Sequence, residues 1–344
     1  MLKNLQLTNF RGLEQLELKQ LNRVNLIVGD NNTGKTSILE ALYLLLASGQ
    51  QLNDFASAFR ATEGESRQTR SDTSDLIERF WLWLFRGHKV DHQLIVQTQL
   101  ESGNTLKAQF GPNHNYPQNL ATLIRSGVGE PQTLIALTSQ EQITIPYYPA
   151  PGIHVSRLSV RPSNPVEDAD QFNQVAIQAG GEEAAESFMR KLEQRLRKLR
   201  YRKLRQNSEA VVYAELDGLK ESIPSTQLGQ AFTRMLHIYC EVQLGRSGVL
   251  LADEIENGVY FENLLPFWSV LLGLVENQDA QLFATTHSFE CMKAAHLAAC
   301  ERADKGGTYD LNIIRLDRVD WGIKATEFGR ETMEVAIANG WEMR

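Results

Sequence analysis

Hydrophobic and polar positions along the chain follow the periods of both strands and helices. Residues 5–7 and 16–18 alternate apolar with polar, and residues 24–28 (VNLIV) form an almost continuous apolar run. A short run of this kind fits a strand that is buried on both faces of a sheet. A glycine-rich turn follows directly, and then an apolar helix pattern over 37–46. Strand, glycine loop and helix in this order form the first unit of an α/β fold.

The later pattern predicts an antiparallel region and then alternating strands and helices. Aromatic residues, among them Trp81, Trp83 and Phe85, are expected in the core or at a subunit interface, ahead of alternating strands at 92–100, 105–110 and 153–160. A helix over 182–205 is indicated by apolar side chains spaced by four, four and three, namely Phe188, Leu192, Leu196 and Leu199. Beyond it the pattern predicts strands at 211–216, 249–252, 281–285 and 311–316, with helices at 228–242, 264–275 and 330–339.

Composition is that of a globular protein. The chain has 344 residues, of which 42% are hydrophobic and 22% charged, and this balance excludes wholesale disorder. The three cysteines, Cys240, Cys291 and Cys300, form neither a disulfide framework nor a CxxC pattern and fit small core residues. No run approaches the roughly 18 uninterrupted apolar residues of a membrane span, and no signal-peptide pattern is seen. We expect a soluble, cytoplasmic protein with no membrane partner.

Charge is unevenly distributed along the sequence. The net charge of −7 argues against nucleic-acid binding by the whole surface, yet residues Arg190–Arg205 hold nine Lys or Arg and one Glu. This basic helix would contact DNA or RNA in a salt-dependent way, dock an acidic partner, or present an inert solvated face. Tyr201 is its only aromatic residue, so base-specific stacking is not expected.

A phosphate-binding loop is the strongest chemical signal. Residues 29–36 read GDNNTGKT and match G-x-x-x-x-G-K-[ST]. Glycines let successive backbone N–H groups cradle phosphate oxygens at a helix N-terminus, Lys35 neutralises phosphate charge, and the Thr36 hydroxyl coordinates Mg²⁺. A simple glycine turn would not explain the Lys and Thr that follow. The predicted ATP-binding residues here are Asn31, Asn32, Thr33, Gly34, Lys35, Thr36 and Ser37.

Polar side chains follow two of the predicted buried strands. Asp253 and Glu254 come directly after 249–252, and His287 follows 281–285. At the C-terminal ends of parallel strands such side chains reach the crevice where ligands bind. Asp253 would then be the second contact to Mg²⁺, Glu254 would polarise an attacking water, and His287 would hydrogen-bond the γ-phosphate or that water. Solvated acids at a strand end and a structural histidine are the alternatives, and the order of the motifs favours the catalytic interpretation.

Four phrases together resemble a known family: 7–13 (LTNFRGL), 29–37, 251–258 (LADEIENG) and 284–288 (ATTHS). They are similar to ATP-binding-cassette-type ATPase heads of the RecF/OLD/SMC branch, and more narrowly to small prokaryotic OLD-like ATPases of anti-phage systems. The resemblance implies an α/β P-loop fold with a mixed central sheet, an antiparallel β segment and a helical insertion. It assigns phosphate and Mg²⁺ binding to Lys35 and Thr36, metal support to Asp253, water activation to Glu254 and γ-phosphate sensing to His287.

The resemblance also implies that ATP lies between two heads, each offering the other a signature segment. The matching position is 228–231, so Gly229 and Gln230 are expected to contact nucleotide. Relatives usually have Gly-Asp-Gly there, and Gln230 and Ala231 depart from this pattern, which leaves the hydrolysis rate open. Only 57 residues follow His287, too few for the nuclease domain of OLD-type nucleases. A separate effector chain, such as a nuclease, is therefore expected.

These inferences predict three regions and one leading function. Residues 1–160 would form an N-terminal ATPase lobe, 161–210 a helical insertion with the basic helix, and 211–344 a C-terminal ATPase lobe. The leading function is an ATP-hydrolysing switch, dimerising around ATP, in DNA processing or anti-phage defence. A nucleotide-dependent oligomeric scaffold with little hydrolysis is the alternative. A transporter ATPase subunit is disfavoured because a Leu-Ser-Gly-Gly-Gln-type signature is missing, and a GTPase because the chain has no Asn-Lys-x-Asp motif.

Overall fold

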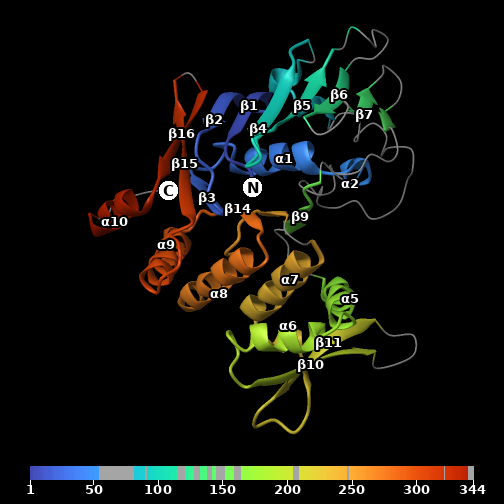
Figure 1. Cartoon of the computed structure of the whole chain (residues 1–344), viewed down its shortest axis with the longest axis vertical. Helices are drawn as coiled ribbons and strands as arrows, with labels where there is room; N and C mark the ends of the chain where they lie inside the picture. The colour runs from blue at the N-terminus through green and yellow to red at the C-terminus, as the bar shows by residue number, and fades with distance from the viewer. Residues whose placement is uncertain are drawn as a thin grey trace.

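Three β-sheets and the helices between them make up the fold (Figure 1). The structure is a computed structural model. It describes residues 1–53, 81–89, 91–112, 114, 121–127, 132–137, 142–144, 152–158, 164–203, 209–245, 248–320 and 322–339.

The central sheet has six strands in the order β16-β15-β3-β14-β13-β9. In chain order these are β3 (Val24–Gly29), β9 (Val155–Leu158), β13 (Val249–Ala252), β14 (Gln281–Thr285), β15 (Leu311–Val319) and β16 (Gly322–Phe328). All but β16 run parallel, so the sheet is mixed as predicted. Every residue of β3, β13 and β14 is buried, which explains their largely apolar sequences. Their C-terminal ends meet at one edge of the sheet.

A second, antiparallel sheet covers one side of the molecule, in the order β2-β1-β4-β5-β6-β7-β8. Its strands are β1 (Leu5–Phe10), β2 (Leu13–Leu18), β4 (Leu94–Gln99), β5 (Thr105–Gly111), β6 (Ala121–Ser126), β7 (Gln132–Leu137) and β8 (Gln142–Thr144). Helix α1 (Lys35–Leu46) lies between this sheet and the central one, and eleven of its twelve residues are buried. One hydrophobic core joins α1 to both sheets, so α1 is held rigidly. The short helix α2 (Gly49–Asn53) follows it.

Helices pack on the other side of the central sheet. They are α7 (Gln230–Gly245), α8 (Leu264–Asn277) and α9 (Phe289–Asp304), with α10 (Arg330–Ala338) against α9 (Figure 1). A second hydrophobic core lies beneath them. Short 3₁₀ turns connect elements at η1 (Arg86–His88), η2 (Ser225–Leu228) and η3 (Phe261–Asn263). Among the helices that the structure describes, none has the length and apolar character needed to cross a bilayer.

The predicted basic helix is wrong. Helix α6 (Gly181–Met189) ends well before Arg205, and Leu196–Lys203 is a strand, β10, paired with β11 (Ala210–Leu216). A β-bulge at Arg197 places two residues of β10 opposite one of β11, because Leu196 pairs with Leu216 while Lys198 pairs with Glu215. The bulge turns Leu196 and Leu199 to the same buried face although they are three residues apart. Buried residues at a spacing of three are typical of a helix, so the pattern led to the wrong prediction.

The insertion therefore combines helices with a sheet. It contains α5 (Pro165–Ala176), α6, and the antiparallel strands β10, β11 and β12 (Ile223–Pro224). Helix α5 was not predicted, although Asn164 caps it and Pro165 begins it, a common arrangement at helix starts. The strand at 311–316 is also followed by a further strand, β16, that was not predicted.

Two of the three predicted core aromatics are buried. Trp81 and Phe85 pack against Phe110 in the core of the antiparallel sheet. Trp83 is instead 41% exposed, because residues 83–84 form a turn and not a strand in which positions 81, 83 and 85 would share one face. Cys240 and Cys291 are buried as predicted, whereas Cys300 is partly exposed.

Candidate nucleotide-binding site

The predicted phosphate loop connects β3 to α1 and depends on its glycines. Gly29 has φ of +136°, and a Cβ there would lie 2.4 Å from the carbonyl oxygen of Leu316 on β15. Gly34 has φ of +92°, directly before the first turn of α1. Both conformations suit glycine alone. The result is a tight turn that leaves the amide groups at the start of α1 facing an open cleft, an arrangement that binds anions.

Lys35 lies inside this loop. Its side chain is only 5% exposed, and Nζ donates hydrogen bonds to the carbonyl oxygens of Gly29, at 2.7 Å, and Asp30, at 2.8 Å. Burial lowers the pKa of Lys35, and the nearby carboxylate of Asp253 partly opposes this shift. A cation held this way sits beside the amides that would receive phosphate.

The structure brings Thr36 and Asp253 together from opposite ends of the chain. Thr36 Oγ1 donates to Asp253 Oδ2 at 3.0 Å, across 217 residues of sequence. Thr285, at the end of β14, donates its hydroxyl to the other carboxylate oxygen, Oδ1. Hydroxyl and carboxylate oxygens are the hard ligands that Mg²⁺ prefers, so this donor set fits the ion. It would bind directly beside the phosphate loop.

Glu254 has a strained backbone. Its φ is +46°, in the left-handed region that non-glycine residues rarely adopt. The conformation is held because the Glu254 N–H donates to Thr285 Oγ1 at 2.8 Å and the next amide, of Ile255, donates to the Thr285 carbonyl at 3.0 Å. Strain of this kind costs about 1–3 kcal/mol and is concentrated at functional sites. It turns the chain sharply directly after Asp253.

His287 lines the cleft, and a third acid fixes its backbone. Glu256 Oε1 accepts hydrogen bonds from Thr286 Oγ1 at 2.7 Å and from the His287 N–H at 3.1 Å. Glu256 was not predicted to be a site residue, although it belongs to the acidic run 253–256. Its alternation with Glu254 was the available signal. Glu256 thus connects the end of β13 to the histidine at the end of β14.

The cleft itself has a volume of about 1370 Å³, larger than a typical small-molecule site of roughly 300–1,000 Å³. All seven predicted loop residues, Asn31 to Ser37, line it together with His287. Asp253 and Glu254 are not among its lining residues, and Asp253 reaches it through Thr36. Other residues that were not predicted for the site also line the cleft, among them the arginines Arg11, Arg86 and Arg318, the acids Glu14 and Asp320, and Trp83. The arginines suit a polyanionic ligand, although Arg11 and Arg86 are already ion-paired with Glu40 and Glu14.

The predicted signature residues lie elsewhere. Gly229 ends the η2 turn with φ of +93°, and Gln230 begins α7. Neither lines the cleft of its own chain. Gln230 packs against Gly258, where a Cβ would come within 2.4 Å of Gln230 Oε1. The segment therefore lies against the loop that follows Glu254.

The basic residues of β10 are surrounded by acids. Arg200 Nη1 pairs with Glu182 at 2.6 Å, and Arg202 Nη2 pairs with Glu215 at 3.5 Å. Ion pairs also join Arg190 to Glu186, Arg195 to Glu193 and Arg197 to Asp217. Arg205 lies outside the described residues. Much of the local positive charge that the sequence shows is thus compensated in the fold.

Comparison with known proteins places this geometry in context. A family model described as an AAA ATPase domain matches residues 1–126. The chain is 20% identical over 327 residues to an ATP/GTP phosphatase from Helicobacter pylori, covering 84% of this chain and 86% of that protein. It is 48% identical over 44 residues to the DNA replication and repair protein RecF of Bacillus velezensis, which is 13% of this chain and 12% of RecF.

Solved structures show the same fold. The SMC head domain from Thermotoga maritima superposes with a TM-score of 0.51 at 12% identity, covering 95% of this chain and 98% of that one. An SMC head bound to the C-terminal winged-helix domain of ScpA gives a TM-score of 0.52 at 14% identity, with coverage of 97% and 99%. The predicted P-loop fold, with its mixed and antiparallel sheets, is confirmed.

Proposed function

We propose that this chain, an ABC-type ATPase of the RecF and SMC branch, binds ATP with Mg²⁺ and hydrolyses it to ADP and phosphate. The observation that carries the proposal is the contact between Thr36 Oγ1 and Asp253 Oδ2 at 3.0 Å, beside the buried Lys35. It joins a phosphate loop to a carboxylate on a neighbouring strand. The AAA ATPase match over residues 1–126 and the phosphatase relative support the same activity.

Each side chain has a role that follows from its position. The amides of the loop from Asn31 to Ser37, with Lys35, would hold the phosphates. Mg²⁺ bound by Thr36 and Asp253 would neutralise phosphate charge. Glu254 would accept a proton from the attacking water, since it directly follows the proposed metal ligand Asp253 and has the strained backbone typical of functional sites. His287, whose backbone is fixed by Glu256, would hydrogen-bond the γ-phosphate.

The switch itself would be association of two heads around ATP. Gly229 and Gln230 are the residues proposed to reach the partner's nucleotide, and their distance from the cleft of their own chain is consistent with action on another. Gln230 packs on the loop after Glu254, so contact of Gln230 with the partner's nucleotide would affect the position of this loop beside the proposed catalytic acid. Association of the two heads would thereby depend on whether ATP or ADP is bound.

We further propose a role in DNA processing or anti-phage defence, with a separate effector chain such as a nuclease. The limited identity to RecF supports a DNA-related role. One structural neighbour was solved with a ScpA domain bound, and a protein partner for this head is proposed by analogy with it. The structure weakens the case for direct DNA contact through residues 190–205, because most arginines of this segment are ion-paired to acids and less positive charge is available for a phosphate backbone.

The second candidate is a nucleotide-dependent scaffold with little hydrolysis. The observation that favours it is the Gly229-Gln230-Ala231 segment, which differs from the Gly-Asp-Gly that the family resemblance implies. Such a protein would assemble on binding ATP and remain assembled. The two candidates differ in turnover, which can be measured directly.

The test measures ATP turnover and ATP-dependent association of the full chain and three variants. Glu254→Gln should bind ATP normally, hydrolyse it roughly 10²–10⁴-fold more slowly and form a longer-lived dimer, because only the general base is lost. Lys35→Ala should lose ATP binding. Glu262→Gln, an exposed acid on η3, is the matched control and should behave as wild type.

Equal turnover in wild type and Glu254→Gln would remove Glu254 from the mechanism. Negligible turnover in both, with assembly driven by a non-hydrolysable ATP analogue, would favour the scaffold. Assembly that ignores both the analogue and Lys35→Ala would refute nucleotide control altogether. Repeating the turnover assay with double-stranded DNA across a salt series would decide the DNA role, since stimulation that fades with salt indicates contact with the phosphate backbone.

A further inference from the structure

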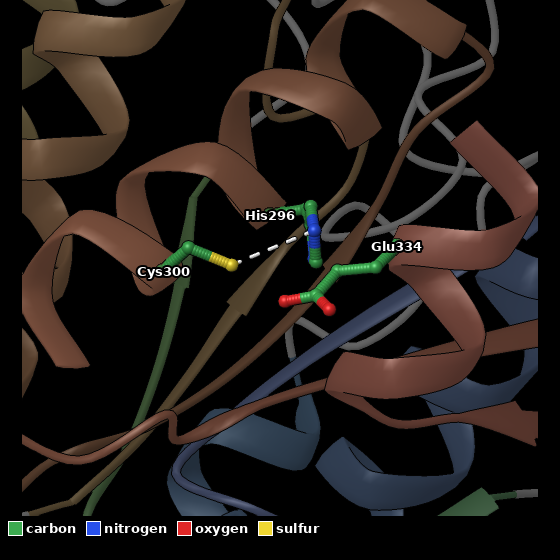
Figure 2. Close-up of side chains that lie close together, drawn as sticks. All are labelled: His296, Cys300 and Glu334. Atoms are coloured by element: carbon green, nitrogen blue, oxygen red, sulfur yellow. Dashed lines mark hydrogen bonds between the residues drawn. The ribbon is translucent and has the colours of Figure 1, made fainter. Parts of the chain in front are cut away.

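A cluster of metal-binding side chains lies away from the nucleotide cleft, between α9 and α10. His296 and Cys300 are one turn apart on α9, and Glu334 reaches toward them from α10 (Figure 2). One ligand atom of each residue, a ring nitrogen, the sulfur and a carboxylate oxygen, lies within 4.8 Å of the other two. Figure 2 shows the three side chains converging on one point from the two helices.

The spacing of these atoms suits a tetrahedral ion. His296 Nε2 and Cys300 Sγ are 3.5 Å apart. In a tetrahedral zinc site, with Zn–N near 2.0–2.1 Å and Zn–S near 2.3 Å, the two ligand atoms stand about 3.5 Å apart. The carboxylate would need to approach by up to about 1.4 Å, since the ligand atoms lie within 4.8 Å of one another and a zinc-bound oxygen lies about 3.4 Å from the nitrogen. Glu334 is half exposed and can make this movement by rotation of its side chain.

A neighbouring tyrosine orients the histidine. His296 Nδ1 is 2.9 Å from the hydroxyl of Tyr309, and the imidazole is buried. This hydrogen bond directs Nε2 toward the sulfur and leaves it as the metal-facing nitrogen. Histidine ligands of metals characteristically have their second nitrogen bonded in this way. The orientation of His296 is therefore already that of a ligand.

The charges of the cluster are consistent with a divalent cation. Burial lowers the pKa of His296, which keeps the imidazole neutral, and burial raises the pKa of the Cys300 thiol, which keeps it protonated until an ion displaces the proton. Arg330 Nε donates to one oxygen of Glu334 at 2.9 Å, an exposed ion pair that the movement of Glu334 toward the ion would rearrange. A thiolate and a carboxylate together carry the charge that balances one divalent ion, and the Glu334 carboxylate would be shared between that ion and Arg330.

We propose that His296, Cys300 and Glu334 form a zinc site that ties α10 to α9, with water as the fourth ligand. Nitrogen, sulfur and oxygen together favour Zn²⁺ over the hard ion Mg²⁺, which prefers oxygen ligands alone. Binding exchanges the thiol proton of Cys300 for the metal, so one proton is released per ion. The site is independent of the phosphate loop and does not rest on the proposed ATPase activity.

The test titrates the full chain, freed of metal by a chelator, with Co²⁺ as a spectroscopic substitute and then with Zn²⁺. We expect one Co²⁺ per chain with a thiolate-to-cobalt charge-transfer band, and displacement of the ion by Zn²⁺. Below the thiol pKa the apparent affinity should rise about tenfold per pH unit, because one proton leaves. Zn²⁺ should also raise the melting temperature, because it binds the folded state.

Variants separate this site from adventitious binding. Cys300→Ser should abolish the charge-transfer band, and Glu334→Gln should weaken Co²⁺ binding roughly tenfold or more. Glu331→Gln, an exposed acid one turn earlier on α10, is the matched control and should bind as wild type. A missing band in the wild-type protein, or a band that survives Cys300→Ser, would overturn the site. Unchanged affinity in Glu334→Gln would overturn the proposed tie between the helices.

Discussion

Thr285 joins the two acids of the candidate site, and replacing it offers a quantitative test of their positioning. Its hydroxyl donates to Asp253 Oδ1 and accepts from the Glu254 N–H, and the residue is fully buried at the end of β14. Thr285→Val keeps the shape of the side chain but removes both hydrogen bonds. The change therefore alters the orientation of Asp253 and Glu254 without opening a cavity.

The expected magnitude follows from these two bonds. A hydrogen bond to a charged group contributes about 1.5–3 kcal/mol, and the Glu254 N–H would lose its partner in a buried position. If that energy is lost from the transition state, kcat falls roughly 10- to 150-fold, at about 1.36 kcal/mol per factor of ten. ATP affinity should change little, because the residue does not line the cleft.

The assay is steady-state ATP hydrolysis with a separate measurement of ATP binding. Thr285→Ser restores the hydroxyl and should recover most of kcat, while a merely structural role would leave both variants equally impaired. A urea titration of each variant shows whether loss of stability accounts for loss of rate. Wild-type kcat in Thr285→Val, or equal loss in Thr285→Ser, would refute the positioning role.

Three further predictions concern the surroundings of the cleft. Glu40→Ala should cost about 3–5 kcal/mol in urea unfolding, because it strips Arg11 of a buried carboxylate that its Nη2 contacts at 2.9 Å, and adding Arg11→Met should recover much of the loss. Trp83 is exposed in the cleft, so ATP should change the intrinsic fluorescence, and Trp83→Phe should remove that change. Asp253→Asn should raise the Mg²⁺ concentration needed for half-maximal turnover roughly 10–100-fold, as measured by Mg²⁺ titration of the ATPase rate.

The central sheet and its loop could be predicted because their signals are local. The runs at 24–28, 249–252 and 281–285 are largely apolar since both faces of the sheet are covered, and the structure makes them strands β3, β13 and β14. Parallel strands place their C-terminal ends together, so polar residues directly after them meet without any further information. Thr36, Asp253 and Thr285 are joined for this reason.

Other parts of the site depend on contacts that no local pattern contains. Trp83 and Arg86 reach the cleft because residue Phe85 bridges to Phe10 and the Arg11 N–H donates to the Leu84 carbonyl, pairing segments far apart in the chain. Alternation with Glu254 marks Glu256 in the sequence, but its contacts to Thr286 and His287 become evident only once β13 and β14 lie side by side.

The stretch at 190–205 shows how a short pattern misleads. Leu196 and Leu199 have helical spacing, and only the bulge at Arg197, set by pairing with β11, explains their common burial in a strand. Its charge was misleading for a similar reason. The acids that pair with Arg197, Arg200 and Arg202 come partly from the following strand, so the isolated segment appears more cationic than the folded surface.

Nucleotide and metal binding at this loop can be seen in a crystal structure with Mn²⁺ in place of Mg²⁺ and a non-hydrolysable ATP analogue, because anomalous scattering locates the ion. We expect the ion beside Thr36 Oγ1 and Asp253, and the triphosphate within the loop from Gly29 to Ser37. An ion or a triphosphate bound elsewhere, with Thr36 and Asp253 contacting neither, would contradict it.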